Sequence, residues 1–327
     1  MKALATSDLS KDYPVGFWRP RPYRALDRLN LDVDPGEVFG FLGPNGAGKT
    51  TTLKLLMQLV FPTSGRAEIL GKPLGDLSVK RRIGYLPEHP YFYDYLSAEE
   101  LLGYFAALFG FSGRERRDRV SRLLDEVGIG AERRLQLRKF SKGMLQRVGI
   151  AQALINDPEL VIFDEPMSGL DPLGRRDVRA LILRLRDRGC TVFFSSHVLS
   201  DAEALCSRVA IMARGRLVTS GRLTEMLAFQ VRGWDLVAAG VSPALLAALS
   251  PRARGVTRIG DGRYHFELPL DVPTDRIVHE VAAAGGQLVS LNPVRDTLED
   301  FFVKQISAPE NASVDRGLDA PAMRKRA

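Results

Sequence analysis

Three short apolar runs in the first two thirds of the chain each end in polar residues. The run at 38–42 leads into a glycine-rich loop, the run at 160–163 into Asp-Glu, and the run at 191–194 into Ser-Ser-His. Apolar residues do not alternate with polar ones in these runs, which is typical of strands buried on both faces. Helical spacing follows the first loop, with apolar residues at Leu53, Leu56, Met57 and Val60, and further helices are predicted at 177–188 and 199–206. The pattern predicts an α/β fold with a parallel sheet and a ligand site along one sheet edge.

A helical segment at about residues 97–140 interrupts this alternation. Ser97 and Ser112 are each followed three residues later by Glu, the capping-box spacing that marks the start of a helix. The apolar face of the first helix is predicted to contain Leu101, Tyr104, Phe105 and Leu108. We therefore expect an inserted helical subdomain within a first domain of residues 1–222.

The pattern changes again after Gly221. Two runs at 256–259 and 264–268 flank Gly-Asp-Gly-Arg, which predicts a β-hairpin. Helices are predicted at 276–284 and 297–306, on either side of a strand at 287–291. Residues 223–306 are thus expected to form a small C-terminal α+β domain. Residues 307–327 have few large apolar side chains and are predicted to be a disordered tail.

Composition places the chain among globular proteins of the cell interior. Its 327 residues are 45% hydrophobic, enough for two buried cores. The longest apolar run, at 236–249, contains Gly and Pro and is too short to cross a bilayer. The first eleven residues lack the apolar segment of a signal peptide, and two cysteines do not form a disulfide framework. We therefore expect a location in the reducing cytoplasm.

The net charge of +7 allows a nucleic acid, an anionic surface or neither as partner. The arginine-rich segment at 112–139 contains no aromatic residue after Arg114 that stacks on bases. Nucleic acid is therefore not an expected partner.

The glycine-rich loop matches the pattern G-x-x-x-x-G-K-[ST] between a predicted strand and a predicted helix. Its residues are Gly43, Pro44, Asn45, Gly46, Ala47, Gly48, Lys49, Thr50 and Thr51. In such loops, backbone N–H groups and a helix N-terminus surround phosphate oxygens. Lys49 is expected to reach the β and γ phosphates, and Thr50 to offer a hydroxyl to Mg²⁺. Alone, the loop indicates a nucleoside triphosphate and does not separate kinases, GTPases and transport ATPases.

Acidic residues and a histidine at the ends of the other two runs favour hydrolysis. Asp164 is the candidate ligand of Mg²⁺, and Glu165 the candidate general base that polarises water. His197 ends the neighbouring run and is expected to bond the γ phosphate and the attacking water.

With these motifs in order, the chain resembles the nucleotide-binding subunit of an ATP-binding cassette (ABC) transporter over about residues 1–222. The matching segments are Gly84-Tyr85-Leu86-Pro87-Glu88 for the switch segment, Phe140-Ser141-Lys142-Gly143-Met144-Leu145-Gln146-Arg147 for the signature segment, and Ser168-Gly169-Leu170-Asp171 for the dimer-contact loop. The resemblance implies a P-loop NTPase fold of the ABC ATPase type. It also implies two subunits, expected to be identical, that enclose two ATP molecules, with Ser141 and Gly143 binding the ATP of the partner.

The sequence departs from the family pattern at two places. Glu88 stands where the family usually has Gln, and the signature reads Phe-Ser-Lys-Gly-Met instead of Leu-Ser-Gly-Gly-Gln. Ser141 and Gly143 keep the groups that a phosphate needs at a helix N-terminus. The resemblance assigns the metal to Thr50, Asp164 and Glu88, and adenine stacking to Tyr13, next to an aromatic and basic stretch that looks like a local insertion.

The resemblance also implies a membrane partner. The aromatic cluster at 91–95 lies where this family docks the coupling helix of an integral membrane permease, although such a cluster also fits the corner of a core. The C-terminal domain resembles the extension of exporter-type members. We therefore expect an ATP-hydrolysing subunit on the inner face of the membrane that drives a separately encoded exporter. The alternatives are a soluble ABC-type ATPase acting in translation or DNA maintenance, and a P-loop kinase, for which the Ser141 segment and His197 have no explanation.

Overall fold

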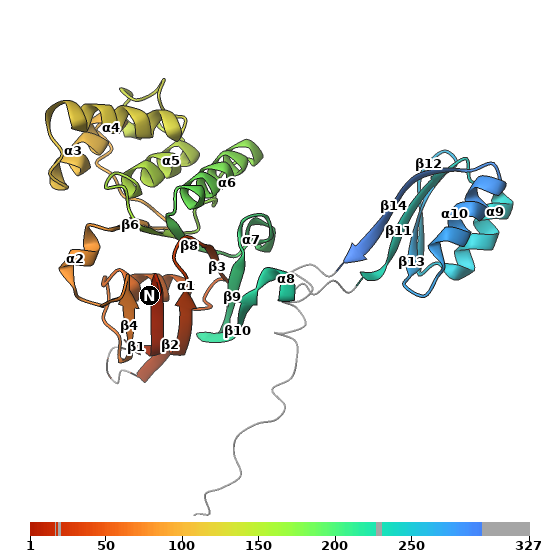
Figure 1. Ribbon diagram of the computed structural model, residues 1–327, viewed down its shortest axis with the longest axis horizontal. Helices are drawn as coiled ribbons and strands as arrows, with labels where there is room; N and C mark the ends of the chain where they lie inside the picture. The colour runs from red at the N-terminus through yellow and green to blue at the C-terminus, as the bar shows by residue number, and fades with distance from the viewer. Residues whose placement is uncertain (17, 19–20, 227–230, 296–327) are drawn as a thin grey trace, which may run out of the picture.

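The computed structural model describes residues 1–295 except 17, 19–20 and 227–230 (Figure 1). Its centre is a six-stranded sheet of order β10-β9-β3-β8-β7-β6, in which only β10 is antiparallel to its neighbour. These strands are β3 (Val38–Leu42), β6 (Ile83–Leu86), β7 (Leu160–Asp164), β8 (Thr191–Ser196), β9 (Arg208–Ala213) and β10 (Arg216–Arg222). The predicted parallel α/β sheet is confirmed, and the three apolar runs are its central strands β3, β8 and β7.

The central sheet is buried on both faces, which is why its strands do not alternate. Every residue of β3, β7 and β8 is buried. On one face, Val38, Val161 and Val192 pack with apolar residues of the helical segment at 97–140 and of the helices that follow it along the chain. On the other face, Phe39, Ile162 and Phe193 pack with the first helix and the N-terminal strands. The helices around the sheet are α1 (Lys49–Leu56), α2 (Leu77–Lys80), α5 (Lys142–Ala153), α6 (Pro172–Asp187), α7 (Leu199–Leu205) and α8 (Leu223–Met226).

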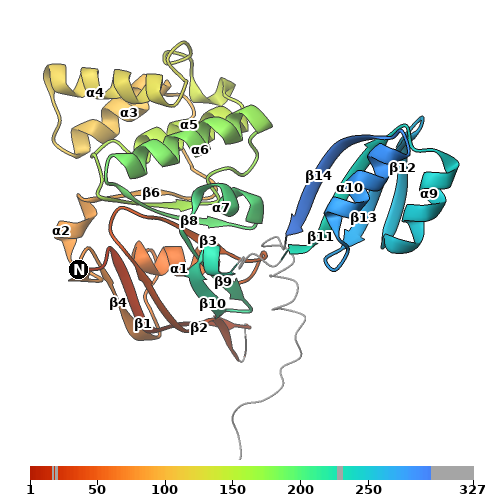
Figure 2. The same cartoon turned by 45° about the vertical axis from the view of Figure 1, so that its right-hand side comes forward.

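A second, antiparallel sheet of order β2-β1-β4-β5 covers the N-terminal part of the core (Figure 2). Its strands are β1 (Leu4–Val15), β2 (Arg21–Val33), β4 (Ser64–Ile69) and β5 (Lys72–Pro73). The apolar pattern does not predict this sheet, because polar residues occupy its exposed positions and bulges shift the register of β1 against β2.

The helical segment contains α3 (Ala98–Leu108), α4 (Gly113–Glu126) and the short 3₁₀ helix η1 (Leu137–Lys139). The capping box at Ser97 is confirmed, with both of its hydrogen bonds formed. The one at Ser112 is wrong: its side chain makes no cap bond, because Gly113 has a φ of 54° and the first turn is irregular. The apolar face predicted for α3 is also wrong in part, since Tyr104 and Leu108 are exposed. The buried face consists of Ala98, Leu101, Leu102 and Ala106.

The C-terminal part has its own sheet and its own small core. Strands β11 (Val231–Ala239), β12 (Gly255–Gly260), β13 (Arg263–Pro269) and β14 (Gln287–Arg295) pair antiparallel in the order β12-β13-β11-β14. With α9 (Pro243–Leu249), η2 (Ser250–Arg252) and α10 (Thr274–Ala283), this makes the βαββαβ arrangement of a ferredoxin-like unit. The hairpin of β12 and β13 is confirmed. The helix predicted at 297–306 and the tail at 307–327 lie outside the described residues. Within the described part of the chain, no helix has the length and apolarity to cross a membrane.

Candidate functional site

The glycine-rich loop turns the chain from β3 into α1 at the end of the central strand. Gly48 stands immediately before α1 with a φ of 100°, a conformation that favours glycine. A Cβ at this position would lie 2.7 Å from the carbonyl oxygen of Ala25. The loop therefore passes close to β2, and both its turn and its packing need glycine here.

The loop forms one wall of a pocket of about 360 Å³. The pocket is lined by residues from β1, β2, the loop, α1 and the ends of β6 and β7: Tyr13, Tyr23, Ala25, Pro44, Asn45, Gly46, Ala47, Gly48, Lys49, Thr50, Thr51, Glu88 and Glu165. The structure thus brings Tyr13, Glu88 and Glu165, which are far apart in the sequence, to the same pocket as the loop.

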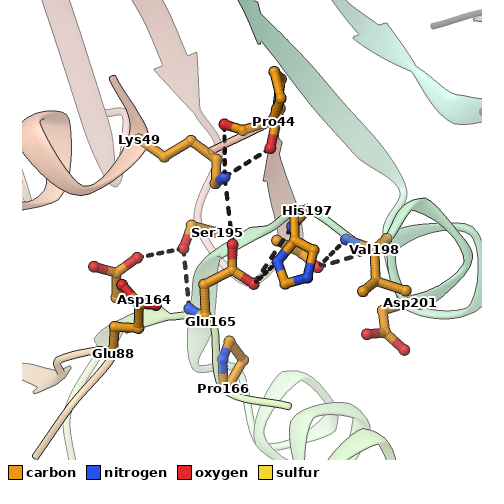
Figure 3. A network of polar contacts seen from close by, with 12 residues as sticks. Pro44, Lys49, Glu88, Asp164, Glu165, Pro166, Ser195, His197, Val198 and Asp201 are labelled. Carbon is orange, nitrogen blue, oxygen red and sulfur yellow. Dashed lines mark hydrogen bonds and ion pairs between the residues drawn. The ribbon is translucent and has the colours of Figure 1, made fainter. Parts of the chain in front are cut away.

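The Lys49 ammonium lies at the centre of the loop and is buried (Figure 3). Its Nζ donates to the carbonyl oxygens of Gly43 at 2.6 Å and Pro44 at 3.3 Å. It also lies 3.3 Å from Oε1 of Glu165. One cation therefore joins the glycine loop to the acidic end of β7.

Asp164 ends β7 and is almost completely buried. Burial raises the pKa of its carboxyl group, and hydrogen bonds from Ser195 and Thr50 act in the opposite direction. Ser195 Oγ donates to Oδ1 of Asp164 at 2.6 Å. The other oxygen, Oδ2, has no hydrogen-bond partner among the described residues. A buried carboxylate oxygen without a partner, beside the Thr50 hydroxyl, fits a hard divalent cation such as Mg²⁺.

Glu165 and His197 form a close pair across the neighbouring strands (Figure 3). Nδ1 of His197 lies 2.8 Å from Oε2 of Glu165, and the His197 side chain is 46% exposed. Glu165 has a φ of 51°, in the left-handed region. This turn of the backbone directs its carboxylate away from that of Asp164 and toward Lys49 and His197.

Glu88 follows β6 and reaches the pocket with a side chain that is 43% exposed. Its negative charge contributes to the raised pKa of Asp164, after burial. The two carboxyl groups therefore repel each other, and a cation between them would relieve that repulsion.

Two tyrosines from the antiparallel sheet lie at the open side of the pocket. Tyr13 on β1 and Tyr23 on β2 are cross-strand partners, and both line the pocket. The ammonium of Lys11 lies 5.0 Å from the centre of the Tyr13 ring. Sequence reasoning missed Tyr23 because it treated this stretch as an insertion; the strand pairing places it beside Tyr13.

Ser141 and Gly143 lie outside this pocket, at the N-terminus of α5. Ser141 caps the helix by accepting a hydrogen bond from the N–H of Met144 at 3.2 Å. A Cβ on Gly143 would lie 3.1 Å from the side chain of Leu170, so the signature segment packs against the loop at 168–171. The structure brings these two segments together, but not to the phosphate loop of the same chain.

The aromatic cluster at 91–95 is exposed on the surface. Tyr91 is 96% exposed, and Tyr93 and Tyr95 are more than half exposed, with their two rings 5.9 Å apart. Phe92 alone packs partly against the core. Three large aromatic side chains without a covering element are typical of an interaction surface.

A family model and several similar proteins relate this chain to known proteins. The family model described as ABC transporter matches residues 26–168. An uncharacterized ABC transporter ATP-binding protein of Synechocystis is 45% identical over 93% of this chain and 84% of its own length. The bacitracin transport ATP-binding protein of Bacillus licheniformis is 35% identical over 93% of this chain and 97% of its own. The Nod factor export ATP-binding protein of Cupriavidus metallidurans is 37% identical over 65% of this chain and 70% of its own.

A solved structure supports the same relationship. It is the dimeric post-hydrolysis state of an ATP-binding cassette bound to ADP and phosphate, and it matches with a TM-score of 0.63 and 26% identity. The match covers 67% of this chain and 98% of the other.

Proposed function

The chain belongs to the ABC transporter family as an ATP-binding, ATP-hydrolysing subunit, and we propose that it powers a separately encoded membrane exporter. The observation that supports ATP hydrolysis most directly is the contact of Glu165 with both the buried Lys49 and His197, at the edge of the pocket that the glycine loop lines. We assign the steps of ATP hydrolysis to these residues.

ATP binds with its phosphates in the glycine loop. The backbone N–H groups at the start of α1 donate to phosphate oxygens, and the helix dipole favours their negative charge. Phosphate oxygens take the place of the Gly43 and Pro44 carbonyls as acceptors for Lys49. The adenine ring stacks on Tyr13, which lines the same pocket as the glycine loop.

The residues that would hold Mg²⁺ are Thr50 through its hydroxyl, Asp164 through its free Oδ2, and Glu88 through its carboxylate. The bound ion would supply positive charge that offsets the negative charge developing during phosphoryl transfer. Asp164 is suited to this because burial keeps water from competing for its free oxygen.

Glu165 acts on the water that attacks the γ phosphorus. The bond from the water oxygen to phosphorus forms as the bond to the β–γ bridging oxygen breaks, and Glu165 takes the proton of the water. His197 holds Oε2 of Glu165 at 2.8 Å and so orients the base toward the γ phosphate. We expect its half-exposed ring to bond the γ phosphate as well.

A second copy of the chain completes the site. Ser141 and Gly143 stand at the N-terminus of α5, an arrangement suited to a phosphate, but outside the pocket of their own chain. In the dimer they bind the γ phosphate held by the partner. ATP therefore joins two subunits, and its hydrolysis separates them.

The membrane partner docks at the exposed tyrosines next to Glu88. This contact ties the state of the nucleotide site to a permease and places the subunit on the inner face of the membrane. Export is the direction we propose, because a relative named for Nod factor export is 37% identical over 65% of this chain.

Glu165→Gln tests the proposed function. We expect ATP binding to persist and hydrolysis to slow by about 10² to 10⁴, because a general base is lost. ATP should then hold two copies together in size-exclusion chromatography. Glu159→Gln, which removes an exposed carboxylate just before the same strand, is the control and should leave both properties unchanged. Normal hydrolysis by Glu165→Gln, or a monomer that has ATP bound, would contradict the proposal.

A further inference from the structure

We propose that Ser195 is a positioning residue that holds the Asp164 carboxylate and the Glu165 backbone in a fixed relation to each other. The inference rests on the proposed function of the same site. Ser195 has no solvent-exposed surface and lies near the end of β8, directly beside Asp164 in the parallel pairing of β7 and β8. Nothing in the sequence pattern singles it out, since it reads as one more residue of a buried strand.

The hydrogen bonds of Ser195 have defined directions. The N–H of Glu165 can only donate, and it lies 3.0 Å from Oγ of Ser195. The single hydroxyl proton is therefore free to go to Oδ1 of Asp164 at 2.6 Å (Figure 3). The Ser195 hydroxyl thus makes a hydrogen bond to each acidic residue at once. While the Asp164 carboxylate is charged, donor and acceptor cannot exchange roles in either bond.

The first bond fixes the orientation of the Asp164 carboxylate. With Oδ1 held by Ser195, the second oxygen, Oδ2, is left without a partner among the described residues and is available to a cation. Without the Ser195 hydroxyl, either oxygen would turn freely toward Thr50 or the metal. We therefore expect the loss of this bond to weaken metal binding, as the loss of a hydrogen bond to a metal-ligating carboxylate does in general.

The second bond holds an unfavourable backbone conformation. Glu165 has a φ of 51°, which costs free energy for a residue with a side chain. Ser195 accepts from the N–H of this residue, and the Glu165 carboxylate contacts Lys49 and His197. Removing the hydroxyl leaves this buried N–H without its acceptor, so the backbone is free to relax and to move the base away from His197.

A purely structural role predicts a different result from a positioning role. Thr191 provides the matched control because it is also buried, lies on the same strand and uses its hydroxyl to accept from the N–H of Gly36 at 2.8 Å. Both Ser195→Ala and Thr191→Val remove one buried hydroxyl with little change in shape. Only the first change touches the acidic pair.

The experiment compares both variants with the wild-type chain. Mn²⁺ binding in the presence of ATP is followed by the electron paramagnetic resonance signal of free Mn²⁺, and ATP binding without metal is followed by calorimetry in EDTA. We expect Ser195→Ala to raise the apparent Mn²⁺ dissociation constant by about tenfold, within the range of 10–100-fold typical of such contacts. Metal-free ATP affinity should stay within about twofold of the wild type. Thr191→Val should leave both constants unchanged, even if it lowers the melting temperature.

The outcomes separate this inference from the proposed function. A wild-type chain that binds no Mn²⁺ with ATP would overturn both. If the wild-type chain does bind Mn²⁺ with ATP, the positioning role is tested alone. An Mn²⁺ dissociation constant of Ser195→Ala equal to that of Thr191→Val would overturn it. If Ser195→Ala does not fold, Ser195→Cys is used. Because a thiol is only a weak donor, the role still predicts a raised Mn²⁺ constant for this variant, and a constant equal to that of the wild type would count against the role.

Discussion

Two adjacent acidic residues acquire different environments from the same strand end. The Asp164 carboxylate accepts a hydrogen bond from the Ser195 hydroxyl, whereas that of Glu165 contacts the cation of Lys49 and the ring of His197. The left-handed φ of Glu165 separates the two side chains. Neighbouring carboxylates in different surroundings are suited to different tasks, which supports the proposal that Asp164 binds a metal and Glu165 acts as a base.

Lys49→Ala tests the residue that links the loop to these acids. We expect ATP affinity to fall by about 2–4 kcal/mol, or about 30- to 1,000-fold, because a buried charge that faces the phosphates is lost. Lys54→Ala is the control, since Lys54 lies on the same helix with an exposed side chain. Isothermal calorimetry measures both. Equal ATP affinity in Lys49→Ala and Lys54→Ala would refute the assignment of the phosphate site.

Asp164→Asn separates stability from function. Burial raises the native pKa of Asp164 above the ordinary value of 3.8, so the folded protein holds this proton more tightly than the unfolded chain does. The free energy of unfolding therefore falls as the pH rises from 3.8, the pKa in the unfolded chain, through the higher pKa of the folded protein. At pH 7 the charged Asp164 carboxylate lowers the stability of the folded protein. Removing the charge should raise the metal-free melting temperature at pH 7, by about 2–4 °C for each kcal/mol gained, and weaken Mg²⁺ binding.

Calorimetric scans at pH 7 and pH 3 check this expectation. The stability advantage of Asp164→Asn over the wild type should shrink at the lower pH, where the wild-type carboxyl group is neutral. A variant that melts below the wild type at pH 7 would show that the hydrogen bonds of the carboxylate outweigh its desolvation.

At the scale of elements, the apolar pattern predicted the strands that are buried on both faces. β3, β7 and β8 are continuous apolar runs, so the sequence located them and the polar residues at their ends. The apolar pattern did not predict the sheet of β1, β2 and β4, because polar residues occupy its solvent-facing positions. The face of α3 was misjudged for a related reason: apolar residues surround this helix, and two sets at helical spacing fit equally well. Contacts with α4 and α5 decide which face is buried.

An ion pair with a buried carboxylate joins α6 and α7, the helices that follow the loop at 168–171 and His197. Asp201 on α7 is almost completely buried and accepts from Arg179 on α6 at 2.5 Å, with Arg175 at 3.9 Å. α6 begins directly after the loop at 168–171, and α7 begins two residues after His197. Sequence patterns gave no sign of this pair, because the two helices meet only in the folded chain.

Arg179→Ala tests this connection between helices. We expect it to lower the free energy of unfolding by about 2–3 kcal/mol, because Asp201 loses its nearer partner while Arg175 remains. Arg176→Ala is the control, since its side chain is 75% exposed and should change stability by less than about 0.5 kcal/mol. Urea unfolding followed by circular dichroism measures both. Equal stability of the two variants would show that the pair contributes little.

At the scale of the whole molecule, the phosphate loop and the signature segment lie at separate places on one chain, and the exposed tyrosines at 91–95 form a third surface. The phosphate loop and the signature segment both face outward, which the resemblance to ABC subunits explains through a second copy. The sequence singled out both segments because each is a short local motif. It did not identify Tyr23, Ser195 or Asp201, whose roles depend on strand pairing and helix packing.

The exposed tyrosines are the surface that carries the proposed contact with a membrane partner. Tyr91, Tyr93 and Tyr95 are all more than half exposed, so replacing the three with Ser removes apolar surface without opening the core. Losing aromatic anchors from an interface commonly costs about 2 kcal/mol or more each, roughly thirtyfold in affinity per residue. We therefore expect the triple variant to lose copurification with the permease while its own ATP hydrolysis and melting temperature change little. None of the three lines the phosphate pocket. A folded variant that still binds the membrane subunit would place the docking surface elsewhere, and one that unfolds would show that the cluster supports the core despite its exposure.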